Sequence, residues 1–391
     1  MFDFFTEEQL MFRDTARKYA QNDVEPLAQQ IDREDRVPQE LIDKARDLSF
    51  FGLYTPEEYG GLGMSLVNSC IVLEEVAKAS PALAGLLNVE IVLCPSTVNK
   101  LGTEEQKQRI LTQSAAGKKL LAWSMTEPSG ATDLPSHLSR IVQDGNGYRV
   151  NGSKLFCTQG TADYILVWAA TQKDGKKGYG CAIVETKQQG VHVAPYESKL
   201  GWRGTNTGSL SFDDVFVTPE NILGDLFTAQ QQLGAEVNQA SFIGHAVTSL
   251  GCAQGLFDKT VAYVNDRKLY GKPMHRLQPV AYWLGKSRAN IEAARTLCYA
   301  AARAYDEGKM DPVAGSLCKG WVCDLMFETT SNLLQLWGGS GMMDSTGVNR
   351  YFRDARANMV AEAASEFHYD KLASDTLGID PAMVYEPSTS Q

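Results

Sequence analysis

The segment SMTEPSGATD at 124–133 marks the point where the character of this chain changes. Before it, apolar residues recur at helical spacing in stretches such as EEQLMFRDTARKYA (7–20) and NSCIVLEEVAK (68–78). After it come short runs rich in β-branched and aromatic residues, including YRVNGSKLFCT (148–158) and GSLSFDDVFV (208–217). This order predicts an N-terminal helical domain followed by a small β-domain.

Helical patterns return from about residue 230 onward. RANIEAARTLCYAAARAYDEG (288–308) and LCKGWVCDLMFETTSNLLQLWG (317–338) are long and amphipathic, and glycines end each of them. Their number and length fit a C-terminal four-helix bundle. The expected fold class is α+β, with domains at 1–121, 122–229 and 230–391. The helical patterns alone would also fit an all-α binding module beside an unrelated β-domain.

Composition excludes several classes of protein. The 391 residues carry 37 basic and 47 acidic side chains, a net charge of −10, which disfavours binding to nucleic acid. The eight cysteines form no CxxC pairs and no clusters with histidine, so no metal site is expected. No apolar run approaches about 18 residues, which argues against membrane spans. The N-terminus MFDFFTEEQLMFRD lacks the basic start of a secretory signal, so the cytoplasm is the expected location.

Three distant segments carry the functional hypothesis together with a fourth. SMTEPSGATD, RKLYGKP (267–273) and QLWGGSG (335–341), followed by RDARANMVAE (353–362), resemble the acyl-CoA dehydrogenase family in order and spacing over essentially the whole chain. Taken singly they would read as a Gly/Pro-rich loop, a charged turn and a helix C-cap. The resemblance implies FAD as cofactor, an acyl-CoA substrate, a homotetramer, and an electron-transfer flavoprotein as electron acceptor.

The resemblance places one set of flavin contacts around the β-domain. In MTEPSGATD, the small hydroxyls of Thr126 and Thr132 can donate to flavin or phosphate oxygens beside Met125. In KLFCTQG (154–160), Phe156 would shield the flavin ring and the Thr158 hydroxyl would approach its N5 atom. The family more often has tryptophan at the position of Phe156, so an altered lid over the flavin is expected.

A second set of flavin contacts lies in the helical C-terminal region. Arg267 is suited to clamp a pyrophosphate because guanidinium stays charged and donates two parallel hydrogen bonds. By resemblance it would bind the FAD of a neighbouring subunit, with Tyr270 near the adenine. Gln335, Gly338 and Gly339 would meet the dinucleotide where a side chain would obstruct close approach. The implied FAD site requires at least a dimer.

Glu362 is the candidate catalytic base. It stands nine residues after Arg353, at the position of the family's commonest catalytic glutamate, although Ala363 and Ala364 replace the glycine and threonine that often follow. The chemistry needs a carboxylate that removes the proton α to a thioester while hydride leaves the β-carbon.

An alternative for Glu362 is purely structural. Helical spacing would place Asp354, Asn358, Glu362 and Glu366 on one face, which would then be a polar stripe facing solvent.

Two further residues are candidates for substrate binding. Some family branches carry the base on a helix at the position of Ser241, and a neighbouring arginine aligns with Phe242, so detailed CoA contacts do not transfer there. His245, close by, is interpreted as packing. Glu90, within the apolar run LLNVEIVLC, could be a second base facing a polar or ring-shaped acyl group, or a hydrogen-bonded structural acid.

The sequence therefore predicts an oxidoreductase acting on CH–CH bonds, which converts an acyl-CoA thioester to the trans-2-enoyl-CoA. A specialised member of the family could instead act on carrier-protein thioesters, run as an enoyl-CoA reductase, or act as a non-oxidative lyase. A nonenzymatic FAD-containing assembly protein is the alternative from a different class.

Overall fold

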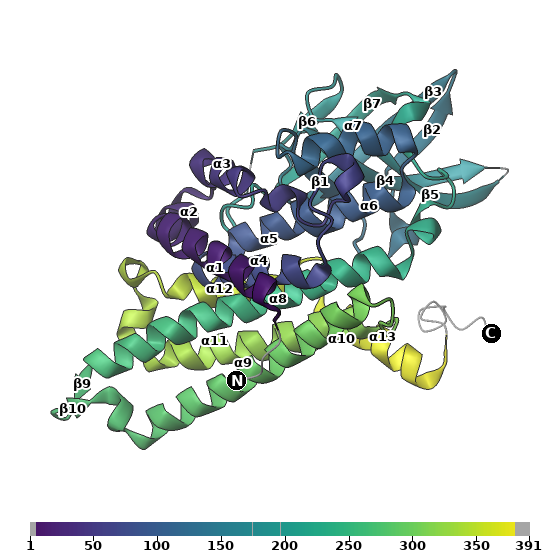
Figure 1. Cartoon of the computed structure of the whole chain (residues 1–391). Coiled ribbons are helices and arrows are strands. Elements are labelled where there is room, and N and C mark those ends of the chain that lie inside the picture. The colour runs from purple at the N-terminus through teal and green to yellow at the C-terminus, as the bar shows by residue number, and fades with distance from the viewer. Residues whose placement is uncertain (1–4, 174, 196, 380–391) are drawn as a thin grey trace.

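The computed structural model describes residues 5–173, 175–195 and 197–379. It shows a helical N-terminal part, a β-sheet domain and a set of long helices that run away from the sheet (Figure 1). The α+β architecture expected from the sequence is confirmed.

The N-terminal part is built from helices whose starts carry strong capping residues. Thr6 opens α1 and Thr103 opens α7, each in a reciprocal capping box with the glutamine three residues on. Ser65 and Ser80 cap α4 and α5 through their hydroxyls. The helices are α1 (Glu7–Tyr19), α2 (Ala28–Glu34), α3 (Gln39–Asp47), α4 (Leu66–Ala79), α5 (Pro81–Asn88), α6 (Cys94–Leu101) and α7 (Glu104–Ala115).

The middle of the chain forms one sheet in the order β6-β7-β3-β2-β4-β5-β8, with β1 pairing in parallel with β4. Helices α6 and α7 cover one face of this sheet, where Trp168 is fully buried. The strands are β1 (Leu121–Ser124), β2 (Arg140–Asp144), β3 (Gly147–Cys157), β4 (Tyr164–Lys173), β5 (Lys176–Glu185), β6 (Val191–Val193), β7 (Gly208–Val217) and β8 (Ile222–Leu223).

The C-terminal part is dominated by α8, a helix of 38 residues that begins beside the sheet and ends at the far tip of the bundle (Figure 1). At that tip a short hairpin of β9 (Lys268–Leu269) and β10 (Lys272–Pro273) joins it to the next helix. The helices are α8 (Ala229–Asp266), α9 (Gln278–Asp306), α10 (Ala314–Leu317), α11 (Cys323–Leu336), α12 (Asn349–Asn358) and α13 (Ser365–Leu377).

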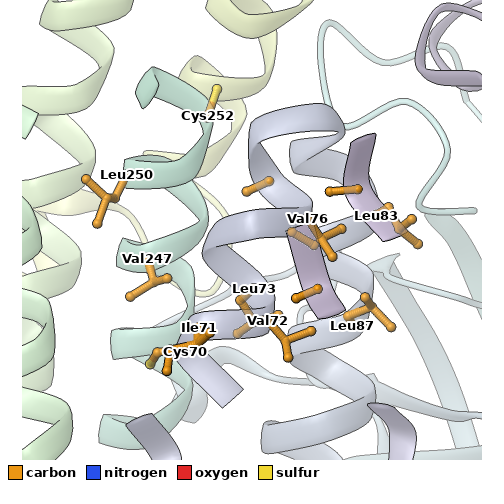
Figure 2. Packing of buried hydrophobic residues seen from close by; sticks show 14 of the residues in the cluster. Cys70, Ile71, Val72, Leu73, Val76, Leu83, Leu87, Val247, Leu250 and Cys252 are labelled. Carbon is orange, nitrogen blue, oxygen red and sulfur yellow. The ribbon is translucent and has the colours of Figure 1, made fainter. Parts of the chain in front are cut away.

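The main core joins the N-terminal helices to the bundle. Helix α4 is buried along almost its whole length and packs between α5 and α8 (Figure 2). Its two buried acids are paired, Glu74 with Arg295 at 3.0 Å and Glu75 with Lys78 at 2.8 Å. Because these charges are matched, a nearly continuous apolar helix can form the centre of the molecule.

One helical stretch, Pro81–Leu101, has the length and apolar composition of a membrane-spanning helix. It lies inside the molecule, however, and 94% of its most apolar window is buried. In this fold it acts as a core helix.

Candidate active site

Glu362 lies in a tight turn between α12 and α13. Helix α12 ends at Asn358, and Glu362 and Ala363 both have left-handed backbone angles, with φ of 55° and 88°. Such angles are costly for residues other than glycine, and strained residues of this kind cluster at functional sites. The polar stripe considered above is wrong, because the helix stops before Glu362, and Asp354 and Asn358 are buried.

A buried lysine holds this turn in place. The Nζ atom of Lys319 donates to the backbone carbonyl oxygen of Asn358 at 2.7 Å and to that of Ala363 at 3.4 Å. Lys319 is fully buried and belongs to a π-helical turn, Cys318–Val322. One ammonium group thus satisfies carbonyls on both sides of Glu362 and fixes where its side chain begins.

The carboxylate of Glu362 is sheltered. Its side chain is 16% exposed, and Oε2 lies 2.9 Å from Nε2 of His245 on α8. The two atoms are close enough for a hydrogen bond but are not aligned for one. Neither carboxylate oxygen therefore has a well-directed donor within the described ranges. The His245 ring stacks on the indole of Trp202, with centroids 5.3 Å apart and planes 12° from parallel.

A buried ion pair supports the loop that follows β1. Nζ of Lys154 donates to Oε1 of Glu127 at 2.7 Å and to the backbone carbonyl of Met125 at 2.8 Å. Burial would raise the pKa of Glu127, but hydrogen bonds from Lys154, Ser139 and Leu138 outweigh it and lower the pKa to about 2. Burial also lowers the pKa of Lys154 to about 8. Both groups are therefore charged at neutral pH.

The candidate flavin-binding residues of this loop differ in their contacts and in their exposure. The carbonyl of Thr126 accepts the backbone N–H of Leu155 at 2.8 Å, which sets the loop alongside β3. Met125 packs on the core of the β-domain, and Thr132 is exposed. The loop therefore has an anchored beginning and an accessible end.

The end of β3 carries the other two candidates. Phe156 is 66% exposed and has a φ of 56°, at a register shift in the pairing of β3 with β7. Thr158 is half-buried, and Gln159 beyond it again has a φ of 56°. A large exposed aromatic ring on strained backbone is the surface that a planar cofactor would cover.

Glu90 lies directly behind this turn. Its carboxylate accepts the backbone N–H of Leu121 at 3.1 and 3.2 Å and the side-chain amide of Gln159 at 2.6 Å. Burial raises its pKa well above the ordinary value, against the effect of the Leu121 amide. Glu90 thus ties a π-helical turn, Val89–Leu93, to β1 and to the turn that follows Thr158.

The thiol of Cys94 is buried at the start of α6. Burial raises its pKa, and the charges of Glu90, Cys157, Cys181 and Glu362 add to the rise. Both carboxylates, Glu90 and Glu362, therefore act electrostatically on the start of α6.

Ser241 on α8 is held by a different set of contacts. It is fully buried, and both its Oγ and its carbonyl accept hydrogen bonds from Nδ2 of Asn88.

Arg267 and Tyr270 lie at the opposite end of the bundle. Arg267 caps the C-terminus of α8 with an exposed side chain, and Tyr270 in the hairpin is 92% exposed with a φ of 51°. Arg267 is roughly 33 Å along α8 from His245, at 1.5 Å per residue. In a single chain it cannot reach a ligand bound beside Glu362.

Gln335, Gly338 and Gly339 belong to the same distal tip. Trp337 between them stacks on Tyr263 at 4.1 Å and donates its indole N–H to Thr260, which fastens the end of α11 to the end of α8. Gln335 and both glycines are exposed, and a Cβ on either glycine would meet nothing within 4 Å. Among the described residues nothing approaches these glycines closely, and Gly338 also has a left-handed φ of 53°.

Sequence reasoning missed Lys319, Trp202 and the contact of His245 with Glu362. For Lys319 a signal exists, since a lysine inside the apolar helical run SLCKGWVC (316–323) has to find buried acceptors. Trp202 in the segment LGWRG (200–204) has no local pattern that would set it against α8.

Comparisons with known proteins agree with this arrangement. Family models for the N-terminal, middle and C-terminal domains of acyl-CoA dehydrogenases match residues 6–118, 122–215 and 241–377. The chain belongs to the acyl-CoA dehydrogenase family. It is an oxidoreductase of that family, whose members are flavoproteins.

Relatives and solved structures span nearly the full chain. A short-chain-specific acyl-CoA dehydrogenase of Clostridium acetobutylicum is 33% identical over 92% of this chain and 96% of its own. A 3-(aryl)acrylate reductase of Clostridium sporogenes is 31% identical over 96% of this chain and 100% of its own. The structure of butyryl-CoA dehydrogenase from Megasphaera elsdenii superposes with a TM-score of 0.92 at 30% identity, covering 96% of this chain and 100% of its own.

Proposed function

We propose that this acyl-CoA dehydrogenase uses Glu362 as the base that removes the α-proton of an acyl-CoA, with FAD as the bound cofactor. The observation that carries the proposal is the Glu362 side chain itself. It is sheltered, fixed by a left-handed turn, and free of well-directed hydrogen bonds to the described residues. A carboxylate in that state can accept a proton from carbon.

Two separate surfaces fit FAD. Near Glu362, the exposed ring of Phe156 on strained backbone offers a stacking face, and the Thr158 hydroxyl lies beside it. At the distal tip, an exposed guanidinium, an exposed phenol ring and two open glycines suit a dinucleotide tail. The residues proposed to hold FAD are Met125, Thr126, Thr132, Phe156, Thr158, Arg267, Tyr270, Gln335, Gly338 and Gly339.

The distance between the two surfaces supports a site shared between subunits. Because Arg267 lies roughly 33 Å along α8 from His245, one chain would supply the flavin-ring surface and a neighbour the dinucleotide surface. We propose a homotetramer, as the family resemblance implies. The complete FAD site then exists only in the assembly.

The reaction is a balanced removal of two hydrogens. Bound FAD supplies a hydride acceptor at N5 of its ring. The chain supplies Glu362, whose carboxylate forms an O–H bond as the α-C–H bond breaks. The backbone N–H of Glu362, which donates to no acceptor in the described part of the chain, is available to the thioester carbonyl.

Partners and location complete the proposal. We propose an electron-transfer flavoprotein as acceptor and the cytoplasm as location, and the buried, unpaired thiols of all eight cysteines support a reducing compartment. For Glu90 we propose the structural role, because hydrogen bonds from Leu121 and Gln159 hold its carboxylate.

The direct test is an anaerobic panel of acyl-CoA thioesters, with flavin absorbance and product mass as readouts. We expect bleaching by some thioester, a product lighter by two hydrogens, and α-proton exchange in D₂O. E362Q should lose both bleaching and exchange, while E366Q, which changes an exposed neighbouring acid, should keep them. A colourless protein that takes up no FAD, or an E362Q variant that still exchanges α-protons, would contradict the proposal.

The reverse direction is a second candidate, because a relative spanning nearly the whole chain is named a 3-(aryl)acrylate reductase. The same residues serve both directions, with Glu362 then delivering the α-proton. Mixing anaerobically reduced protein with an enoyl-CoA tests it. Rapid return of the flavin colour supports reduction, and product mass distinguishes both directions from elimination without oxidation.

A further inference from the structure

His245 lies beside the Glu362 carboxylate. Its Nε2 is 2.9 Å from Oε2, and the residue is 2% exposed. The proposed mechanism gives His245 no task. A histidine used only for packing on α8 would not need a ring nitrogen 2.9 Å from a carboxylate.

The orientation of the imidazole is set from two sides. Its face stacks on Trp202, whose backbone N–H donates to Oδ1 of Asp354 at 2.6 Å. The indole in turn presses on Gly85 of α5, where a Cβ would lie 2.6 Å from Cη2. With the indole fixed by α5 and α12, the ring plane of His245 is fixed as well, and Nε2 stays 2.9 Å from Oε2 of the base.

The tautomer follows from the other ring nitrogen. Nδ1 is buried and has no hydrogen-bond partner among the residues the structure describes. An orphaned buried N–H is rarer in proteins than an orphaned acceptor, so the proton belongs on Nε2. In this tautomer the imidazole presents an N–H to Oε2, and the present off-line approach can tighten when substrate fills the site.

We propose that His245 is the positioning residue for the catalytic base: its Nε2–H holds Oε2 of Glu362 and leaves Oε1 to take the substrate proton. This inference rests on the proposed function. During the reaction the α-C–H bond breaks, its electron pair stays with the substrate, and the O–H bond forms on Oε1. His245 keeps its own proton throughout.

Other ionisable groups surround the pair and have to be held constant in any test. They come from each element packed around the turn: Lys319 before α11, His368 and Lys371 on α13, Asp354 on α12, Glu90 in the π-helical turn before α6, and Cys94 at its start. A substitution at His245 leaves these side chains in place, although it removes one of the contributions that lower the pKa of His368.

Two substitutions separate donation from packing. H245F keeps an aromatic face for Trp202 but has no N–H, whereas H245Q can place an amide N–H near the position of Nε2. The probes are the acyl-CoA that bleaches the wild-type flavin fastest, followed by stopped flow from pH 5.5 to 9, and the infrared carboxyl band of Glu362. That band is assigned by its absence in E362Q and needs no substrate.

For H245F we expect the acid limb of the rate profile and the titration of the infrared band to move together toward higher pH, by about one unit. At pH values on the acid limb the rate should fall about tenfold, with less than a twofold change in acyl-CoA affinity. H245Q should restore both readouts to within about threefold of wild type. If H245F does not fold, the smaller H245V carries the same expectation.

An H245F protein with an unmoved band and an unmoved acid limb would overturn the positioning role, whatever its thermal stability. The proposed function fails by a different result, namely α-proton exchange that survives in E362Q. In that case the infrared measurement still reports on the pair, so the two failures are distinguishable.

Discussion

Lys154 and Glu127 form a fully sheltered ion pair, 2.7 Å from Nζ to Oε1, directly beneath the loop that begins with Met125. Removing one partner of such a pair leaves the other charge buried and unmatched. We therefore expect K154M to lower the free energy of unfolding by about 3–5 kcal/mol and to weaken FAD retention. Thermal unfolding and the flavin content of the purified protein measure these effects.

The double variant E127Q/K154M is the internal control for that prediction. It removes both charges, so most of the lost stability should return. K286M, which opens an exposed pair with Glu328 at 3.0 Å, should cost less than about 1 kcal/mol. Equal losses for K154M and K286M would show that the buried pair has no special role.

The composite flavin site predicts complementation between two inactive chains. R267M should be inactive because FAD loses its dinucleotide clamp, and E362Q should be inactive because the base is gone. When the two chains are co-assembled, half of the mixed sites combine an intact Glu362 with an intact Arg267 from the neighbour. Those sites should recover activity, measured as flavin bleaching by acyl-CoA.

The control for complementation is a chain that carries both changes, R267M/E362Q, co-assembled with R267M. No site in that mixture has both intact residues, so no recovery is expected. If the first mixture, R267M with E362Q, forms mixed oligomers and still recovers no activity, that result would place Arg267 and Glu362 in independent sites.

How far sequence reasoning reached is clearest at Glu362. The motif spacing located the residue, but the same i, i+4 spacing from Asp354 also fits a continuous helix. The helix ends at Asn358, where Lys319 donates to the carbonyl oxygens of Asn358 and Ala363. That contact joins segments about 40 residues apart, and local periodicity carries no information on such contacts.

His245 illustrates a different limit. The apolar run around it predicts a buried helix face, and the ring is indeed packed, against Trp202. Its second contact, with Glu362, depends on how α8 and the turn after α12 are brought together. The order of the domains follows from pattern, whereas a pairing across the core depends on tertiary packing.

The pH dependence of stability should carry a contribution from His368. Burial, reinforced chiefly by the charges of Lys319 and Lys371, lowers its pKa to about 3 from an ordinary value near 6.5. Below about pH 6.5 the unfolded chain binds a proton at this histidine, whereas the folded state stays unprotonated until about pH 3. The contribution of His368 to the free energy of unfolding is therefore fully present above about pH 6.5 and declines as the pH falls toward 3. By pH 5 the loss should be about 2 kcal/mol.

Chemical denaturation at pH 7.5 and pH 5 checks this contribution. The difference in unfolding free energy between the two pH values should shrink by about 2 kcal/mol in H368Q and stay unchanged in H192Q, because His192 on β6 is exposed. Parallel stability curves for wild type and H368Q would contradict the assignment.

Phe156 should matter for flavin retention and little for folding. Its ring is 66% exposed in the chain, so F156A removes few internal contacts. A lost aromatic stacking contact is worth about 0.5–1.5 kcal/mol, which corresponds to roughly 2- to 12-fold weaker FAD binding. Equilibrium dialysis of FAD and thermal unfolding of the apoprotein separate the two effects, and F156W should bind at least as well as wild type.

Gly85 is the point where the support behind His245 can be tested mechanically. A Cβ there would lie 2.6 Å from the indole of Trp202, a distance at which something has to move. Alanine in a helix gains about 0.5–1 kcal/mol over glycine, whereas overpacking a core costs about 1–3 kcal/mol. We expect G85A to be destabilising on balance, by up to about 2 kcal/mol, and to slow flavin bleaching because the displaced indole no longer holds His245.

The matched substitution is G285A on α9, a helical glycine whose added Cβ would meet nothing within 4 Å. It should stabilise the protein by about 0.5–1 kcal/mol and leave bleaching unchanged. W202F replaces the indole with a shorter ring and so relieves the clash with the Cβ added at position 85. Combining it with G85A should restore part of the stability in a double-mutant cycle. If G85A behaves like G285A in both measurements, the Trp202 indole between α5 and His245 does not orient the imidazole. The orientation of the imidazole then has to come from α8 alone.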